Sequence, residues 1–205
     1  MTSTSSVQDF SLSACILAGG LGTRLGGVDK GWIEVGGIPL VQRVMDCLRA
    51  QVNAGLINAN RGIDEYARLG WPVVADGVSD FAGPLAGISA GLDAARTEWV
   101  LFVPVDAARL PGDLAPRLCE AVKQNGSPAA FVCTSEGPMP VCCLVSRSLR
   151  DGLRQALADG ERSVIAWLRG LQAATVLYEE WPLEYWSLNT PEERARVEAL
   201  LLGDH

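Results

Sequence analysis

The sequence predicts an α/β protein in which helices cover both faces of a mostly parallel central sheet, in a three-layer, Rossmann-like arrangement. Short apolar runs recur along the chain and alternate with segments whose apolar residues follow i, i+3, i+4 spacing. Such alternation is typical of strand–helix–strand units. Several runs are apolar at every position, as expected for strands that are covered on both faces. Glycine-rich or polar residues follow several runs, and ligands of open α/β sheets bind at that edge.

The expected strands and helices follow from these two patterns. Strands are expected over the apolar runs 14–18, 56–59, 73–76, 99–106, 129–134, 141–146 and 174–178. Helices are expected over the amphipathic segments 41–52, 85–92, 114–122, 149–157 and 164–171. A last helix is expected to begin at Thr190, because Thr190, Pro191 and Glu193 supply a cap, a proline at the first helical position and a reciprocal glutamate.

The length and composition fit one domain. The chain has 205 residues, of which 48% are hydrophobic, so one sizeable core can be buried. Residues 1–11 are polar and lack the basic and apolar regions of a signal peptide, so we expect a flexible leader there. No long linker or repeat divides the remainder, and we expect residues 12–205 to form a single domain.

Charge and residue usage argue against several functions. The net charge of −7 disfavours broad binding to nucleic acid or to an anionic membrane. No apolar run reaches the ~18 to 20 residues of a membrane span. The only histidine is His205, which argues against a Ser-His-Asp triad, an H-E-x-x-H zinc site or a histidine base. The six cysteines form no C-x-x-C pair, which favours reduced thiols in a cytoplasmic protein.

A glycine-rich segment follows the first expected strand. Residues 17–31 read L-A-G-G-L-G-T-R-L-G-G-V-D-K-G, in which Arg24 and Lys30 accompany six glycines. Backbone N–H groups and cations in this layout suit a phosphate group. The segment is neither a Walker A loop nor a G-x-G-x-x-G fingerprint, because Leu25 stands where the third glycine belongs. The alternative is a mobile surface loop without a ligand.

Polar residues mark the ends of three further strands. Asp106 closes the run W-V-L-F-V-P-V-D, where it either caps a turn or binds Mg²⁺, which takes one or two carboxylates plus phosphate oxygens. Asp76 either contacts a ribose or base edge or caps the turn before Gly77. Asn58 and Asn60 are expected on one side of a strand, either at the ligand or as solvent-facing amides of an edge strand.

These segments together resemble the molybdenum cofactor guanylyltransferase family, within the glycosyltransferase-A-like nucleotidyltransferases. The shared motifs are, in order, L-A-G-G-x-x-x-R-x-G-G-x-D-K-G from Leu17, N-A-N-R at 58–61, D-x-x-x-D-x-x-G-P-L-A-G at 76–87, Asp106 after P-V, and N-T-P-E-E at 189–193. The resemblance covers about Ala14 to Leu201. It implies transfer of GMP from GTP to Mo-molybdopterin, with release of pyrophosphate, formation of the guanine dinucleotide cofactor and Mg²⁺ as cofactor.

The resemblance also implies roles for individual residues. Arg24, Lys30 and Asp106 are expected to be catalytic, and Asp106 to bind the metal. The GTP contacts are expected from Leu17, Ala18, Gly19, Gly20, Gly22, Thr23, Arg24, Lys30, Asn58, Asp76, Gly83, Pro84, Leu85 and Asp106. Arg162 and Asn189 are expected near the pterin or behind the residues that contact the substrates. Cofactor-delivery proteins and recipient molybdoenzymes are the implied protein partners.

Departures from the family pattern leave alternatives open. Asp106 lacks the proline that usually follows two residues later, and Ser187 stands where an asparagine is usual. The nearest alternative is the sister cytidylyltransferase, whose sequences tend to read L-A-A-G where residues 17–20 read L-A-G-G, and this difference favours guanine. Another small-molecule nucleotidyltransferase and a nucleotide-binding adaptor without turnover are the remaining alternatives.

Overall fold

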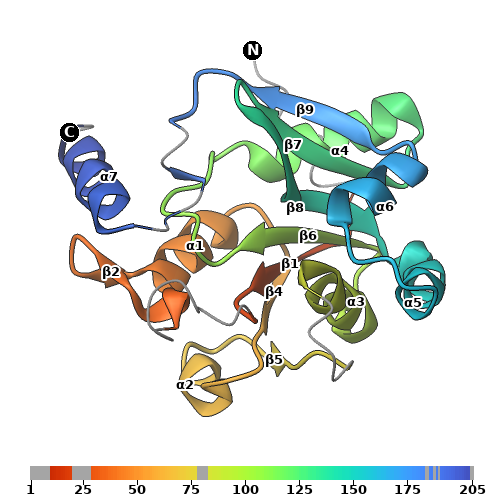
Figure 1. The fold of residues 1–205 in the computed structure, drawn as a ribbon, viewed down its shortest axis with the longest axis horizontal. Coiled ribbons are helices and arrows are strands. Elements are labelled where there is room, and N and C mark those ends of the chain that lie inside the picture. Colours follow the sequence, from red (N-terminus) through yellow and green to blue (C-terminus); the bar gives the residue numbers. More distant parts are fainter. Residues whose placement is uncertain are drawn as a thin grey trace.

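A seven-stranded sheet with the strand order β5-β4-β1-β6-β8-β7-β9 forms the centre of the structure (Figure 1). The structure is a computed structural model that describes residues 10–19, 29–77, 83–182, 185–186, 188 and 190–203. The strands of this sheet are β1 (Leu12–Leu17), β4 (Ala54–Asn58), β5 (Val73–Val74), β6 (Trp99–Pro104), β7 (Ala129–Thr134), β8 (Gly137–Ser146) and β9 (Ala174–Tyr178). Each expected strand is therefore present, with shifted ends for most of them.

The sheet is mostly parallel, as predicted. β1 pairs in parallel with β4 and β6, β4 with β5, and β7 with β9. β8 is antiparallel to both of its neighbours, β6 and β7. The reason is local, because β7 and β8 are joined by a tight turn between Thr134 and Gly137, with no helix to return the chain.

Helices cover both faces of the sheet, which confirms the expected three layers. The helices are α1 (Leu40–Arg49), α2 (Ile63–Ala67), α3 (Pro84–Ala94), α4 (Leu114–Asn125), α5 (Arg150–Ala158), α6 (Val164–Gly170) and α7 (Pro191–Gly203), with 3-10 turns η2 (Lys30–Trp32) and η3 (Arg147–Leu149). Buried side chains of α1 and α4 pack on one face, and those of α3, α5 and α6 on the other.

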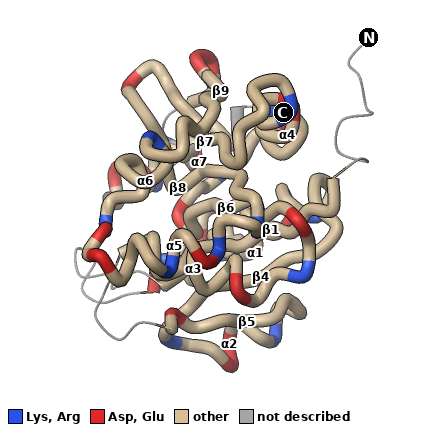
Figure 2. Tube along the Cα trace, turned by 90° about the vertical axis from the view of Figure 1, so that its right-hand side faces the viewer, with Lys and Arg blue, Asp and Glu red and all other residues tan. Residues whose placement is uncertain are grey.

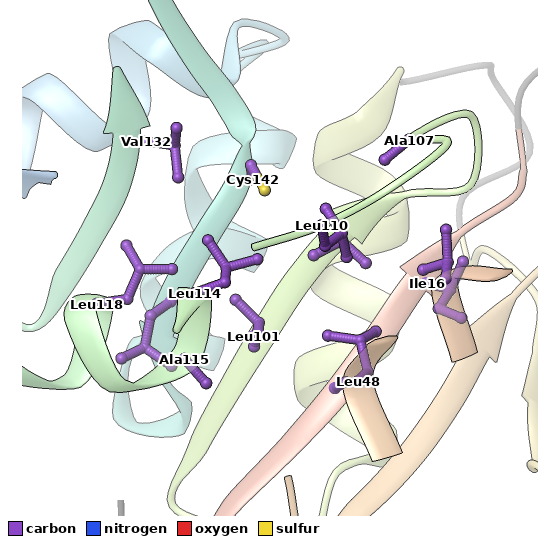
Figure 3. Close-up of a cluster of buried hydrophobic side chains, with 14 of the residues drawn as sticks. Ile16, Leu48, Leu101, Ala107, Leu110, Leu114, Ala115, Leu118, Val132 and Cys142 are labelled. Atoms are coloured by element: carbon purple, nitrogen blue, oxygen red, sulfur yellow. The ribbon is translucent and has the colours of Figure 1, made fainter. Parts of the chain in front are cut away.

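The alternation of strand side chains explains the continuously apolar runs. In β1, Ala14 and Ile16 belong to the cluster under α1 and α4, whereas Cys15 belongs to the cluster under α3 and α5. Figure 3 shows the first cluster, where Leu48 of α1, Leu101 of β6 and Leu114 of α4 come from three elements into one interior. β1 is buried on both faces, so each of its positions favours an apolar residue.

The C-terminal helix packs away from the central sheet. A short hairpin of β2 (Glu34–Val35) and β3 (Ile38–Pro39) turns through Gly36 and Gly37, whose φ angles are +58° and +74°. Val35 of this hairpin, Ala108 and Val197 of α7 belong to one small buried cluster. α7 begins as predicted, because Thr190 Oγ1 accepts from Glu193 N at 3.1 Å and Glu193 Oε2 accepts from Thr190 N at 3.1 Å.

Charged residues of both signs are interspersed along the chain (Figure 2). Asp and Glu number 24 and Lys and Arg 17.

Among the described helices, none has the length and apolarity that crossing a membrane requires. All six cysteines are free thiols, and burial raises the pKa of Cys15 and of Cys119 to about 12. The predicted boundary between leader and domain stays a prediction.

Candidate nucleotide-binding site

The carboxyl ends of four strands meet at one edge of the sheet. Leu17, the last residue of β1, is opposite Asn58 of β4 on one side and Pro104 of β6 on the other, and Asn58 is opposite Val74 of β5. The segments that leave these strands contain Gly19, Asp76 and Asp106. The register confirms that the predicted polar groups share one rim.

Lys30 and Asp106 form an ion pair at this rim. Lys30 Nζ lies 2.7 Å from Asp106 Oδ2, although 76 residues separate the two in sequence. Both groups are partly shielded, with side-chain exposures of 25% for Lys30 and 16% for Asp106. A predicted phosphate-binding cation and the predicted metal-binding carboxylate are therefore neighbours, and each offsets the other's charge.

The turn that presents Lys30 is capped by its own sequence. Asp29 precedes η2, and its Oδ1 accepts a hydrogen bond from Gly31 N at 3.0 Å. This cap satisfies a donor that the short 3-10 turn leaves free. Asp29 lies inside the quoted D-K-G motif, but sequence reasoning gave it no role. The signal was an aspartate immediately before the lysine, a common capping residue.

Asp76 is held by two asparagine amides. Asn58 Nδ2 donates to Asp76 Oδ1 at 2.8 Å, and Asn60 Nδ2 donates to Asp76 Oδ2 at 2.7 Å. Asp76 N donates in return to Asn60 Oδ1 at 2.9 Å. Asn58 is 2% exposed and lies on an interior strand, so its reading as a solvent-facing amide is wrong. Asn60 lies beyond the end of β4, so the expectation of a shared strand is wrong for that residue.

Two glycines make room for this amide–carboxylate cluster. A Cβ at Gly19 would lie 3.1 Å from Asn60 Nδ2 and 3.2 Å from Asn58 Oδ1. A Cβ at Gly87, inside α3, would collide with Asn58 Oδ1 and lie 2.9 Å from Leu17 Cδ2. Both glycines therefore serve the packing of the protein's own side chains. Gly87 and Asn60 were not predicted as site residues.

Replacing Gly87 by alanine is expected to destabilise the protein by about 1–3 kcal/mol, as overpacking of a filled interior does. The added methyl would push Asn58 away from Asp76, so nucleotide affinity should fall as well. Gly152→Ala in α5 is the matched control, because nothing lies within 4 Å of its Cβ position. Chemical denaturation of both variants measures the difference, and equal stabilities would contradict the packing account.

The start of α3 lies beside the loop that carries Arg162. Gly83 has a φ of +66°, and Pro84 occupies the first turn of the helix. A Cβ at Gly83 would be 4.0 Å from Arg162 O. The Arg162 side chain is exposed, and its Nη1 donates to Leu157 O and Glu161 O, each at 2.8 Å. Leu85 is fully buried in the core, so only its backbone is left to contact a ligand.

The turn after Asp106 closes without the usual proline. Ala107 N donates to Pro104 O at 3.3 Å, and Arg109 N donates to Tyr185 O at 3.4 Å. The Arg109 guanidinium lies over the rings of Trp181, at 5.5 Å, and Tyr185, at 5.6 Å. The loop is therefore tied to the segment before α7.

Five of the predicted site residues lie outside the described residues: Gly20, Gly22, Thr23, Arg24 and Asn189. Ser187 lies outside them as well.

A rim of this kind is characteristic of α/β proteins that bind nucleotides at the carboxyl edge of a parallel sheet. The family model for the MobA-like NTP transferase domain matches residues 14–174. The chain belongs to this family.

Sequence relatives agree with this assignment, and a solved structure shares the fold. A molybdenum cofactor guanylyltransferase of Serratia proteamaculans (strain 568) is 40% identical over 185 residues, 90% of this chain and 93% of that protein. One of Polynucleobacter asymbioticus (strain DSM 18221 / CIP 109841 / QLW-P1DMWA-1) is 39% identical over 194 residues, 93% of this chain and 97% of that protein. Molybdopterin-guanine dinucleotide biosynthesis protein A from Archaeoglobus fulgidus shares the fold, with a TM-score of 0.71 at 21% identity over 93% of this chain and 99% of that one.

Proposed function

We propose that the chain transfers GMP from GTP to Mo-molybdopterin, releasing pyrophosphate and forming the guanine dinucleotide cofactor. The observation that carries the proposal is the 2.7 Å ion pair between Lys30, which belongs to the glycine-rich segment 17–31, and Asp106, which follows β6. The names of the sequence relatives support the same activity, because those proteins match about nine-tenths of this chain.

The phosphates of GTP belong, in this proposal, at the segment between β1 and η2. Leu17, Ala18 and Gly19 are proposed to contact the nucleotide, and the Lys30 ammonium offsets phosphate charge. The amide of Ala18 itself donates to Asn58 O at 2.8 Å, so it serves the sheet. The same role is proposed for Gly20, Gly22, Thr23 and Arg24, on the sequence motif alone.

The base is proposed to meet Asp76 and Asn58. Carboxylate oxygens are acceptors only, so Asp76 suits a ligand edge that carries N–H donors. Guanine has two adjacent donors on its Watson–Crick edge, at N1 and at its amino group, whereas cytosine has only the amino group there. The carboxylate that two amides hold in place thus favours guanine. Gly83, Pro84 and the backbone of Leu85 are proposed to lie along the nucleotide.

Magnesium fits the donors at the rim. Asp106 supplies a carboxylate oxygen, the ligand that Mg²⁺ prefers, and Mg²⁺ bound with nucleotides takes one or two carboxylates and fills its shell with phosphate oxygens and water. Within the described residues, no three His, Cys, Asp or Glu side chains converge on one point. When bound, the ion would neutralise phosphate charge during the transfer. Lys30 would then leave Asp106 for a phosphate oxygen.

The reaction needs no histidine base. The nucleophile is an oxygen of the pterin's terminal phosphate, which is already ionised at neutral pH. It forms a bond to the α-phosphorus of GTP while the bond from that phosphorus to the bridging oxygen breaks, and pyrophosphate leaves. The chain's tasks are to align the two phosphates and to offset their repulsion, which Lys30 and the backbone amides perform. Arg162 and Asn189 are proposed on the pterin side.

Nucleotide selectivity tests the proposal. Thermal unfolding is measured with GTP, CTP, ATP and UTP, each with Mg²⁺. GTP is expected to stabilise the folded state most, by about 2.7 kcal/mol at a hundredfold excess over its dissociation constant. A preference for CTP would replace the guanylyl reading by the cytidylyl one. GTP binding without pyrophosphate release in the presence of Mo-molybdopterin would instead indicate an adaptor.

The location of the protein, its protein partners and its extent as one domain belong to the same proposal. A cytoplasmic location and exchange of the cofactor with delivery proteins and recipient molybdoenzymes are what the activity requires, and one domain over residues 12–205 would suffice for it.

A further inference from the structure

A buried tyrosine outside the predicted site supports the turn that presents Lys30. Tyr66 lies in α2, the five-residue helix after β4, and its side chain is fully buried. α2 has no other buried residue. The only side chain that this helix buries is therefore directed at the segment 29–32, which precedes the hairpin β2–β3.

Tyr66 contacts three residues of that segment. Its hydroxyl donates to Asp29 Oδ1 at 2.6 Å, the same oxygen that accepts from Gly31 N at 3.0 Å. A Cβ at Gly31 would collide with the tyrosine hydroxyl, so this residue must be glycine for the turn to lie flat on it. The Trp32 ring packs on the Tyr66 ring, with centroids 5.1 Å apart at an interplanar angle of 31°. Lys30 is the one residue of η2 whose side chain is directed to Asp106.

We infer that Tyr66 is a positioning residue for Lys30, acting through the Asp29 carboxylate and the Gly31 amide. The inference rests on the proposed role of Lys30 at the phosphates of GTP. The turn has only three residues. Two backbone hydrogen bonds close it, Trp32 N to Asp29 O and Ile33 N to Lys30 O, each at 3.1 Å, and the Asp29 carboxylate is its one side-chain cap. The hydroxyl fixes the capping carboxylate, the cap fixes the turn, and the turn determines where the Lys30 ammonium lies.

The protonation state of Tyr66 agrees with a permanent donor. Burial, and then the hydrogen bond to Asp29, raise the pKa of Tyr66 above its ordinary value. The hydroxyl therefore keeps its proton throughout the neutral range. Asp29 receives this O–H and the Gly31 N–H on one oxygen, so its position is defined by two donors from different elements.

The chain contains a matched control for this arrangement. Tyr178 in β9 donates to Asp113 Oδ1 at 3.0 Å and is 6% exposed. β9 is the strand at the edge of the sheet opposite β5, three strands away from β6, which leads to Asp106. Tyr178→Phe therefore removes a hydroxyl of the same kind, from a buried ring bonded to an aspartate, without touching the segment that carries Lys30.

The test compares single-turnover transfer of GMP from GTP to Mo-molybdopterin in the wild type and six variants. Tyr66→Phe keeps the buried ring and is expected to lower the maximal transfer rate about tenfold, the effect of one hydrogen bond used for positioning. The GTP concentration that gives half of this rate should change less than about threefold. Tyr178→Phe should remain within about twofold of the wild type, because it lies outside the machinery. In a Lys30→Ala background, Tyr66→Phe should add nothing, because both changes act on the same ammonium.

Asp29 provides an independent route to the same turn. Asp29→Asn keeps an oxygen that accepts both donors, so its rate should stay close to that of the wild type. Asp29→Ala removes that oxygen and should reproduce the loss seen in Tyr66→Phe. These two variants leave the buried ring unchanged, so they decide the question even if Tyr66→Phe folds poorly.

The outcomes separate the inference from the function on which it rests. A wild type that forms no guanylylated product, or a Lys30→Ala variant as fast as the wild type, overturns the proposed function and the inference together. A wild type and Lys30→Ala that behave as expected, with Tyr66→Phe as fast as Tyr178→Phe, overturn the positioning role alone. So do losses from Lys30→Ala and Tyr66→Phe that multiply in the double variant.

Discussion

Replacing Asp106 by alanine is expected to lower the rate of guanylyl transfer about a thousandfold. A loss of this size is expected when a site loses the ligand of an ion that neutralises charge in the transition state. The carboxylate lies in the turn after β6, which ends at Pro104, and is the proposed magnesium ligand. Its loss leaves the Lys30 ammonium without the 2.7 Å contact but removes no apolar packing. The free energy of unfolding should therefore change by only about 1 kcal/mol, as for a partly exposed ion pair.

Rates and stability are measured together for this variant. Asp106→Asn keeps the shape of the side chain and removes the charge, so it should lose most of the activity as well. Asp151→Ala, which removes an exposed aspartate of α5, is the control and should match the wild type. Activity of Asp106→Ala within a few-fold of the wild type would remove the metal-ligand role.

Replacing Lys30 by alanine is expected to lower kcat by about a hundredfold or more, as the removal of one preorganised charge from an active site does. The ammonium lies beside Asp106, and Lys30 belongs to the glycine-rich segment proposed to bind the phosphates. Its loss also leaves a partly shielded carboxylate without its cation, which disfavours a nearby triphosphate. The larger effect should be on kcat, because the charge to be offset grows as the α-phosphorus is attacked.

Lysine usage provides the control for this variant. The chain contains only two lysines, Lys30 and Lys123, and Lys123 is exposed on α4. Lys123→Ala should keep full activity. Lys30→Arg tests whether charge is enough, and it should restore only part of the rate, because a guanidinium is larger and planar where the turn presents a compact ammonium. Equal rates for Lys30→Ala and Lys123→Ala would contradict the account.

Most strands of the central sheet could be predicted because they are buried on both faces. The run 129–134 coincides with β7. The run 174–178 coincides with β9, an edge strand in which Thr175 and Leu177 are exposed. The antiparallel β8 had a signal as well, because no helical segment separates its run from that of β7. The hairpin β2–β3 was missed because its strands have two residues each, although Gly36-Gly37 is a turn signal. The helix α2 was missed because it buries only Tyr66.

The candidate site was predictable in its location and only partly in its contacts. Parallel strands bring their carboxyl ends to one edge, so the rim followed from the alternation of strands and helices. The pairing of Lys30 with Asp106 could not be predicted in this way. It depends on the position of the turn that carries Lys30, which lies 76 residues from Asp106 in the sequence. The alternation with Asn58 predicted Asn60 in the same strand. In the structure β4 ends at Asn58, and the Asn60 side chain donates to Asp76 from beyond the strand.

Product analysis tests the central claim most directly. The purified protein is incubated with Mg²⁺, Mo-molybdopterin and either GTP or CTP, and the pterin product is identified by mass spectrometry while pyrophosphate is quantified. With GTP we expect a product that carries one added GMP and one pyrophosphate for each product formed, and with CTP little of either. A product from CTP in preference to GTP, or none from GTP, would contradict the account.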